Sequence, residues 1–432
     1  MVWLVAKEWR DLTTSRVWWL MLALVGPLVG LSFIDAVHAF AEISTGAGTA
    51  CGAVCAPLLG VWGPTFSAYE VLAIFVLPFV AIKLVSGDRQ SGALKLELQQ
   101  AVSPLVRIGV KGLVLLAGWC VTLAAAAVAL GLWTFYGGHL YAPEMGVALL
   151  GHFLNAGLTV ALAIAVASMA DHPSTAAIVT LAITIGTWVL DLAAAIHGGI
   201  WDQFAKYTPA AMVATFQRGL LQADIVAIVL VITLAGFAMA AVWIRLGVFV
   251  RRRVLETVVI VVVAAMAIVG ASRIPGTWDI SESRQNSFSI ASEEWLAKVT
   301  LPIVVEVHLA PQDPRRWQLD RGALGKLRRA LPNLQVRYVS RSTTGLYEQH
   351  DDDYGALRFT TGDRQNTSRV LTDDGVLEGL FALVGLEWEE EADGSYHGYP
   401  LTAQPVGAAW IYYALWPLAV AGLGIRAIRR TS

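Results

Sequence analysis

The chain has 432 residues and a formal net charge of −2; 56% of its residues are hydrophobic and only 15% are charged. This composition excludes an ordinary soluble domain, and the near-zero charge gives no basic field that would favour nucleic acid. Three cysteines are too few for a disulfide framework. We expect Cys51 and Cys55 to be small apolar side chains, with a disulfide between them as the alternative.

The first sixteen residues predict an amphipathic helix that lies in the membrane interface. Apolar residues recur there at helical spacing, with charged residues between them: Val2, Val5, Trp9 and Leu12. Tryptophan is a common anchor at membrane interfaces, which favours this interpretation. The alternative is that residues 1–16 only extend the first membrane span.

Apolar runs that are long enough to cross a bilayer of about 30 Å follow along the chain. They lie at 17–40, 66–85, 112–136, 146–170, 175–196, 224–246, 254–272 and 407–425. We therefore predict a mostly α-helical membrane protein with about eight spans. A six-span core at 17–246 is followed by a seventh span at 254–272 and an eighth at 407–425.

Lysine and arginine gather in alternate connections and decide the orientation. They lie before the first span, in the 86–111 loop, between the sixth and seventh spans and in the 426–432 tail, whereas 41–65 and 137–145 contain none. Because positively charged loops stay on the cytoplasmic side, we predict that both termini and the 86–111 loop are cytoplasmic. The segment 273–406 is then extracytoplasmic.

The 86–111 loop is long and polar although it joins two apolar spans. It begins with charges of both signs at Asp88 and Arg89, followed by the small residues Ser91 and Gly92. Apolar residues follow at Leu94, Leu96 and Leu98, and the segment ends with the basic residues Arg107 and Lys111. A chain that only sat in lipid would need no more than a short turn here. A segment of this length and polarity is suited to docking on a soluble partner.

The segment 273–406 has frequent charges and short alternating apolar runs, unlike the rest of the chain. It predicts strands at 303–309 and 335–339, a basic helix at 319–331, a hairpin from 356–360 and 368–371, and a helix at 373–384. Strands that alternate with helices indicate a small α/β domain between the last two spans.

No residue pattern in the chain predicts catalysis. Gly87 and Gly92 have the glycine spacing of a P-loop, but Ala93 and Leu94 stand where that loop needs Lys and Ser or Thr. No Gly-x-Ser-x-Gly or His-Glu-x-x-His motif is present, and 273–406 contains no cysteine nucleophile. We predict that the chain is not an enzyme and that it binds no metal and no cofactor.

The polar loop resembles the one that follows the second span in permeases of the type-2 ABC exporter superfamily. The matching residues are Asp88-Arg89-Gln90-Ser91-Gly92-Ala93-Leu94-Lys95, then Ser103-Pro104-Leu105, then Val110-Lys111-Gly112. In that family the loop holds a coupling helix that sits in a cleft of the ATPase subunit. The resemblance implies that ATPase coupling depends on Asp88, Arg89, Gly92, Leu94 and Leu98.

The connection between the fifth and sixth spans resembles the same family. There, short helices end in an Arg-Gly pair before an acidic residue, which corresponds here to Arg218, Gly219 and Asp224. The alternative, which we favour for the individual residues, is that they are helix caps and interface anchors without transport chemistry.

The start of the extracytoplasmic domain carries a second resemblance. The run Trp278-Asp279-Ile280-Ser281-Glu282-Ser283-Arg284, followed by Ser287-Phe288-Ser289, is similar to the motif that opens the extracytoplasmic domain of GldG-type proteins. These proteins accompany a GldF-type permease in gliding-motility ABC transporters. The chain thus resembles a fusion of a GldF-like permease and a shortened GldG-like auxiliary, with Asp279, Ser281, Arg284 and Ser289 as its domain-opening motif.

The resemblances imply a permease subunit in a bacterial cytoplasmic membrane. Two copies of an ABC ATPase, which bind ATP and Mg, would drive it, together with a second copy of the chain or a related permease. The spans carry few ionisable groups, which favours a lipid-like or amphipathic cargo over a highly charged one. The alternative is a non-transporting scaffold or sensor that binds an envelope protein through 273–406.

Overall fold

The computed structural model describes residues 2–47, 52–90, 92–93, 100, 102–197, 200–205, 207–299, 301–310, 313–331, 333–339, 353–385 and 396–429. Within these ranges, eight helical segments are long and apolar enough to cross a membrane. They are Arg16–Gly46, Leu58–Gln90, Pro104–Phe135, Ala142–Met169, Pro173–Ala194, Ala223–Trp243, Val250–Ala271 and Ala408–Arg429. The prediction of a mostly helical membrane protein with eight spans is confirmed, although several ends differ.

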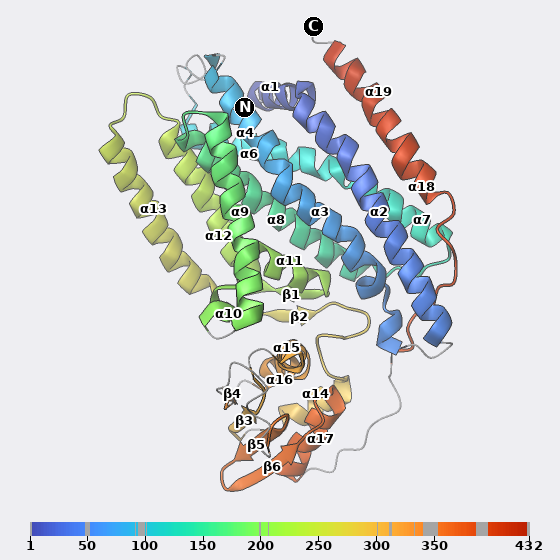
Figure 1. Ribbon diagram of the computed structural model, residues 1–432. Coiled ribbons are helices and arrows are strands. Elements are labelled where there is room, and N and C mark those ends of the chain that lie inside the picture. The colour runs from blue at the N-terminus through green and yellow to red at the C-terminus, as the bar shows by residue number, and fades with distance from the viewer. Residues whose placement is uncertain are drawn as a thin grey trace. The chain divides into compact units, whose positions relative to one another are not determined.

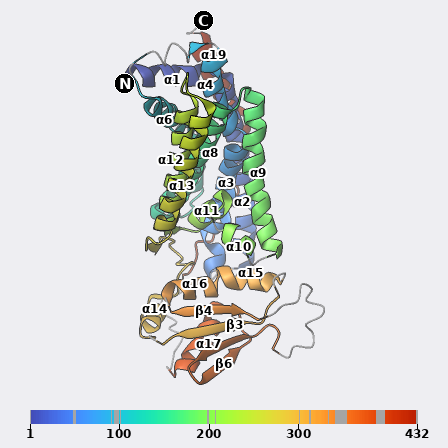
Figure 2. The same ribbon diagram turned by 90° about the vertical axis from the view of Figure 1, so that its left-hand side faces the viewer.

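The chain divides into two compact units. The first comprises Met1–Trp188, Pro209–Trp278 and His397–Ser432, and the second comprises Val189–Thr208 and Asp279–Tyr396. The first unit is a bundle of long helices, and both chain termini lie at one end of it (Figures 1 and 2). We call this the terminal end of the bundle and the opposite one the far end.

The bundle is built around α8 (Ala142–Met169), the most buried of the eight spans. It packs against α3 (Gly63–Phe75), α4 (Leu77–Gln90), α6 (Pro104–Thr122) and α12 (Ala223–Trp243). Small residues allow this, because a Cβ on Gly236 of α12 would lie only 3.1 Å from that of Ala161. Close approach of helix backbones at small residues is a common way to pack helices in lipid.

Two spans that the sequence predicts as continuous helices are broken. The second consists of η2 (Leu58–Trp62), α3 and α4, and the third consists of α6 and α7 (Ala124–Phe135). At the second break, the Tyr69 hydroxyl donates to the Thr122 carbonyl at 2.9 Å and accepts from the Ala126 amide at 3.1 Å. A buried tyrosine thus satisfies backbone groups that the break leaves open.

The N-terminal helix α1 (Val2–Thr14) is separate from α2 (Arg16–Ala47), as the sequence predicts. Its buried face, however, consists of Leu4, Glu8 and Leu12, and Val2 is 85% exposed. This face packs against α6 and α4 of the bundle. The helix therefore buries a carboxylate among its leucines, which the apolar pattern alone does not predict.

The last span is formed by α18 (Ala408–Trp410), η3 (Ile411–Leu415) and α19 (Trp416–Arg429), which pack against α2. The Trp416 indole donates to the Leu22 carbonyl at 2.7 Å, and the Tyr412 hydroxyl donates to the Ala125 carbonyl at 2.9 Å. Both rings fit because α2 has glycine opposite them. A Cβ on Gly30 would lie 2.4 Å from Tyr412.

The segment before this span is fastened to the far end of the bundle. The Tyr399 amide donates to the Cys55 carbonyl at 3.0 Å, and the Tyr399 ring stacks on His139 with centroids 3.6 Å apart. Cys55 is disulfide-bonded, which corrects our expectation of a free apolar side chain; Cys51 lies outside the described residues. Cys55 ends η1 (Gly52–Cys55), a short 3-10 turn.

Several further elements complete the chain. They are α9 (Pro173–His197), α10 (Ile200–Ala205), α11 (Pro209–Gln217), α13 (Val250–Ala271) and a two-stranded sheet of β1 (Leu220–Gln222) and β2 (Thr277–Asp279). The helix α13 is the least buried of the eight spans.

The second unit contains a four-stranded sheet in the order β4-β3-β5-β6. The strands are β3 (Ile303–Val307), β4 (Leu334–Tyr338), β5 (Leu357–Thr361) and β6 (Arg364–Ser368); β3 runs parallel to β4 and antiparallel to β5. Alternate side chains of β3 and β5 are buried. They form an apolar core with helices α16 (Ala323–Ala330) and α17 (Asp373–Val384).

The predicted elements of this unit agree with the structure in type, and most of them differ in their limits. The predicted helix at 319–331 is split at Gly322 into α15 (Pro314–Arg321) and α16. The second strand of the hairpin begins at Arg364 rather than at 368, because Gly362 takes a left-handed φ of 54° and makes the turn tighter. The predicted helix at 373–384 coincides with α17.

We expect Gly30→Ala to destabilise the bundle by about 1–3 kcal/mol, because the added methyl overlaps the Tyr412 ring. Gly46→Ala in the same helix is the control, since a Cβ there meets nothing within 4 Å. The thermal unfolding midpoint of the detergent-solubilised protein checks this. Equal midpoints for the two variants would contradict the close packing of α2 on η3.

Candidate functional site

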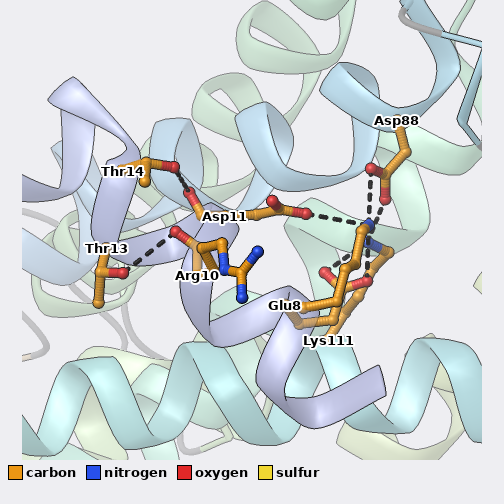
Figure 3. Close-up of polar contacts among 8 residues, drawn as sticks. Glu8, Arg10, Asp11, Thr13, Thr14, Asp88 and Lys111 are labelled. Carbon is orange, nitrogen blue, oxygen red and sulfur yellow. Dashed lines mark hydrogen bonds and ion pairs between the residues drawn. The ribbon is translucent and has the colours of Figure 1, made fainter. Parts of the chain in front are cut away.

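Four charged side chains form an ion-pair cluster at the terminal end of the bundle. They come from three helices: Lys7 and Glu8 from α1, Asp88 from α4 and Lys111 from α6. The Lys111 ammonium lies 2.7 Å from the Glu8 carboxylate and also pairs with Asp88, and Lys7 lies 2.9 Å from Asp88. Figure 3 shows both carboxylates directed at the Lys111 nitrogen.

Three of the four residues are buried, and Lys7 is half-buried at the edge of the cluster. Glu8 is 0% exposed, Lys111 3% and Asp88 7%. Burial raises the pKa of the Glu8 carboxyl above its usual range, while Lys111 by its charge and hydrogen bond and Lys7 by its charge oppose this rise. Removing charges from water is costly, so these groups are stable here only because they compensate one another.

Two arginines near the cluster hold further backbone groups. Arg89 lies before residues 91–103 and Arg107 lies after them. The Arg89 guanidinium donates to the carbonyls of Ala170 at 2.6 Å and Ser168 at 2.8 Å, at the end of α8. A cation at the C-terminus of a helix is favourable, because the last carbonyls there lack partners within the helix. Arg107, which is 2% exposed, donates to the carbonyls of Gln100 at 3.1 Å and Val102 at 3.3 Å.

The structure thus places Asp88 and Arg89 differently from the expectation that both face a partner protein. Both side chains point into the bundle, because a buried lysine and the open end of α8 attract them. Gly92 has a φ of 76° and its amide donates to the Arg89 carbonyl at 3.4 Å, as expected for a tight turn. Leu94 and Leu98 lie outside the described residues.

The residues of the second family motif lie at helix ends. Gly219 follows α11 with a φ of 77°, and its amide donates to the Phe216 carbonyl at 2.9 Å. Asp224 lies in the first turn of α12, where a carboxylate is favourable. Arg218 is half-buried beside them. This geometry agrees with the interpretation of these residues as caps, which we favoured from the sequence.

The domain-opening motif forms one hydrogen-bonded loop in the second unit. The Asp279 carboxylate accepts from the backbone amides of Ser281 at 3.1 Å and Asn286 at 2.9 Å and from both of their side chains. Arg284, at a left-handed φ of 47°, donates to Glu293 at 2.8 Å, and Ser289 caps helix α14 (Ile290–Ala297). The motif therefore has a structural role in holding this loop.

A second polar group, which the sequence analysis missed, lies within the bundle. The Gln217 amide of α11 lies 2.9 Å from the Glu70 carboxylate of α3 and 3.2 Å from Nε2 of His152 of α8. The signal was present in the sequence, because Glu70 and His152 are ionisable residues inside predicted apolar spans.

The ion-pair cluster contains only carboxylates and ammonium groups that neutralise one another. Its geometry offers no substrate-facing acid, base or nucleophile. It can, however, hold three helices at fixed distances from one another, because charge pairs in a low-dielectric site are strong and directional. A mechanical role in the bundle fits this arrangement better than a chemical one.

We expect Lys111→Met to destabilise the bundle by about 3–5 kcal/mol, because Glu8 and Asp88 then lose their shared buried partner. Arg252→Met is the control, since Arg252 is 71% exposed in its pair with Glu256 and such pairs contribute only about 0.3–0.5 kcal/mol. Thermal unfolding in detergent compares the two. Similar small losses in both variants would show that the cluster contributes little.

The effect of this variant should depend on pH through Glu8. A carboxyl whose pKa is raised on folding favours the folded state at low pH and loses this contribution as the pH rises through its folded-state pKa. Lys111→Met removes the cation that opposes the rise at Glu8. The loss of stability relative to the wild type should therefore be smallest at acidic pH and grow toward neutral pH, as unfolding midpoints across this range will test.

We expect Asp279→Ala to loosen the start of the second unit, because four donors lose their charged acceptor. The cost of such bonds is about 1.5–3 kcal/mol each when one is removed alone. Limited proteolysis of the full chain should show faster cleavage after residue 279. Asp363→Ala, in an exposed turn of the same unit, should leave the cleavage rate unchanged.

The functional inference rests on this geometry and on the residue patterns of the chain itself. Searches for related sequences and folds found that no family model, no curated protein and no solved structure matches the chain.

Proposed function

We propose that the chain is the membrane-spanning permease subunit of an ABC exporter. It couples ATP hydrolysis in a separate ATPase subunit to export or to force transmission to the cell envelope. The observation that carries this proposal is the way the polar loop 86–111 is fastened to the bundle on both sides of residues 91–103. Asp88 and Arg89 fix one end, and Arg107 and Lys111 fix the other.

A force applied to the polar loop would reach most of the bundle through these contacts. Asp88 connects α4 to α1 and α6, and Arg89 connects α4 to the end of α8. Because α8 packs against five other helices of the bundle, a displacement of its end would reorient several spans together. Asp88 and Arg89 thus transmit the movement, while the apolar residues Leu94 and Leu98 make the docking contact.

The complex would contain two copies of the ATPase and either a second copy of this chain or a related permease. ATP and Mg would bind to the ATPase, and no nucleic acid takes part. The complex would lie in a bacterial cytoplasmic membrane with both termini on the ATPase side. The segment 273–406 would then face the envelope and contact a partner protein there.

The test is a pull-down of the tagged, detergent-solubilised chain from its native host, with ATPase activity measured on the eluate. We expect a P-loop ATPase to co-purify. Asp88→Asn should retain the ATPase but reduce its coupling to transport, because the pairs with Lys7 and Lys111 are weakened. The double variant Leu94→Asp, Leu98→Asp should lose the ATPase altogether.

Leu246→Asp is the matched control for the loop variant. Leu246 is 55% exposed in the connection between α12 and α13, so an added charge there should change neither association nor activity. Full coupling in Asp88→Asn would contradict the transmission role. The eluate could instead contain no ATPase and only envelope proteins bound through 273–406. That result would overturn the proposal of an exporter permease and support the alternative of a non-transporting scaffold.

A further inference from the structure

The polar group of Glu70, His152 and Gln217 lies deep within the bundle, away from the ion-pair cluster. Glu70 belongs to the helical segment Leu58–Gln90 and His152 to Ala142–Met169, both of which are long and apolar enough to cross a membrane. Ionisable side chains in such segments are costly to bury in lipid and mark functional sites more often than surface residues do.

The hydrogen bonds of this group leave specific atoms free. The Gln217 amide donates to one Glu70 oxygen, Oε1, at 2.9 Å and lies 3.2 Å from Nε2 of His152. If the amide donates to both, the His152 proton resides on Nδ1, which is buried and has no hydrogen-bond partner among the described residues. The second carboxylate oxygen of Glu70 also has none within the described parts of the chain.

When the Glu70 carboxyl is ionised, the group carries a negative charge that no described lysine or arginine neutralises. No lysine or arginine in the described ranges forms an ion pair with Glu70, in contrast to Asp88 and Glu8. The buried rings of Phe66 and Tyr69 lie 5.8 and 6.0 Å from the His152 ring centroid and pack around the inner member of the group. A carboxylate without a cationic partner attracts the positive charge of an organic cation.

The carboxylate can be reached from the side of the bundle. His152 is 1% exposed, whereas Glu70 and Gln217 are only half-buried. Glu70 borders a face of α3 on which Ser67 and Val71 are exposed. A ligand that meets this face contacts the apolar side chain of Val71 as well as the carboxylate, so an amphipathic molecule suits it.

We propose that Glu70, held by Gln217 and His152, binds the positively charged group of an amphipathic molecule that enters from the membrane. This inference rests on the proposed function, for which it names the class of cargo. Glu70 supplies the compensating charge, and Gln217 fixes the orientation of its carboxylate. The Gln217 amide is in turn held by its contact with Nε2 of His152. A neutral or anionic amphiphile of equal size would lack the charge pair.

The test is direct binding to the purified full-length chain in lipid nanodiscs, with no ATPase present. The probes are tetraphenylphosphonium and its anionic counterpart tetraphenylborate, which have nearly the same size and shape, and empty nanodiscs correct for partition into lipid. We expect saturable binding of the cation only. Glu70→Gln should weaken it about tenfold or more, the factor that one lost interaction of about 1.4 kcal/mol gives.

Glu42→Gln is the control, because Glu42 is an exposed glutamate of α2 and should leave binding unchanged. Gln217→Ala should weaken binding of the cation less than Glu70→Gln does, since it removes the support and not the charge. Three results would each overturn the proposed site. They are unchanged binding of tetraphenylphosphonium in Glu70→Gln, an equal loss of its binding in Glu42→Gln, and saturable binding of tetraphenylborate. Because no ATPase is present, these results are independent of the pull-down that tests the exporter.

Discussion

Charge compensation inside a low-dielectric bundle is the constraint on which the terminal end of this protein depends. Glu8, Asp88 and Lys111 are individually costly to bury, and each is stable only while the others are in place. Three helices are therefore held at one relative position by a few atoms. Apolar contacts alone would allow them to slide, because lipid is as favourable a neighbour as another apolar helix.

The sequence predicts the number and type of elements well, because apolar runs and strand alternation depend on local composition. It does not predict where a helix breaks inside an apolar run. The break at Leu123 needs a partner distant in sequence, the Tyr69 hydroxyl, which satisfies the backbone groups beside it. Nor does it predict the burial of Glu8, whose partner Lys111 lies 103 positions away.

The sequence selects Asp88 and Arg89 as site residues but does not predict where their side chains point. Asp88, Arg89 and Gly92 were selected by their resemblance to a docking loop, yet the two charged side chains are directed into the bundle. The sequence shows that a charged side chain is present. The direction in which it points depends on which oppositely charged group, remote in sequence, the fold brings close to it. Glu70, His152 and Gln217 were missed for a similar reason, since they come from three separate helices.

The pairing of Glu8 with Lys111 also constrains the order in which the chain matures. Glu8 belongs to a helix that precedes the eight described spans, but its buried partner Lys111 belongs to the third of them. Until that span is inserted, α1 cannot bury its carboxylate against Lys111. This helix is synthesised before the spans, yet it is among the later ones to reach its final position, and it closes the terminal end once the bundle has formed.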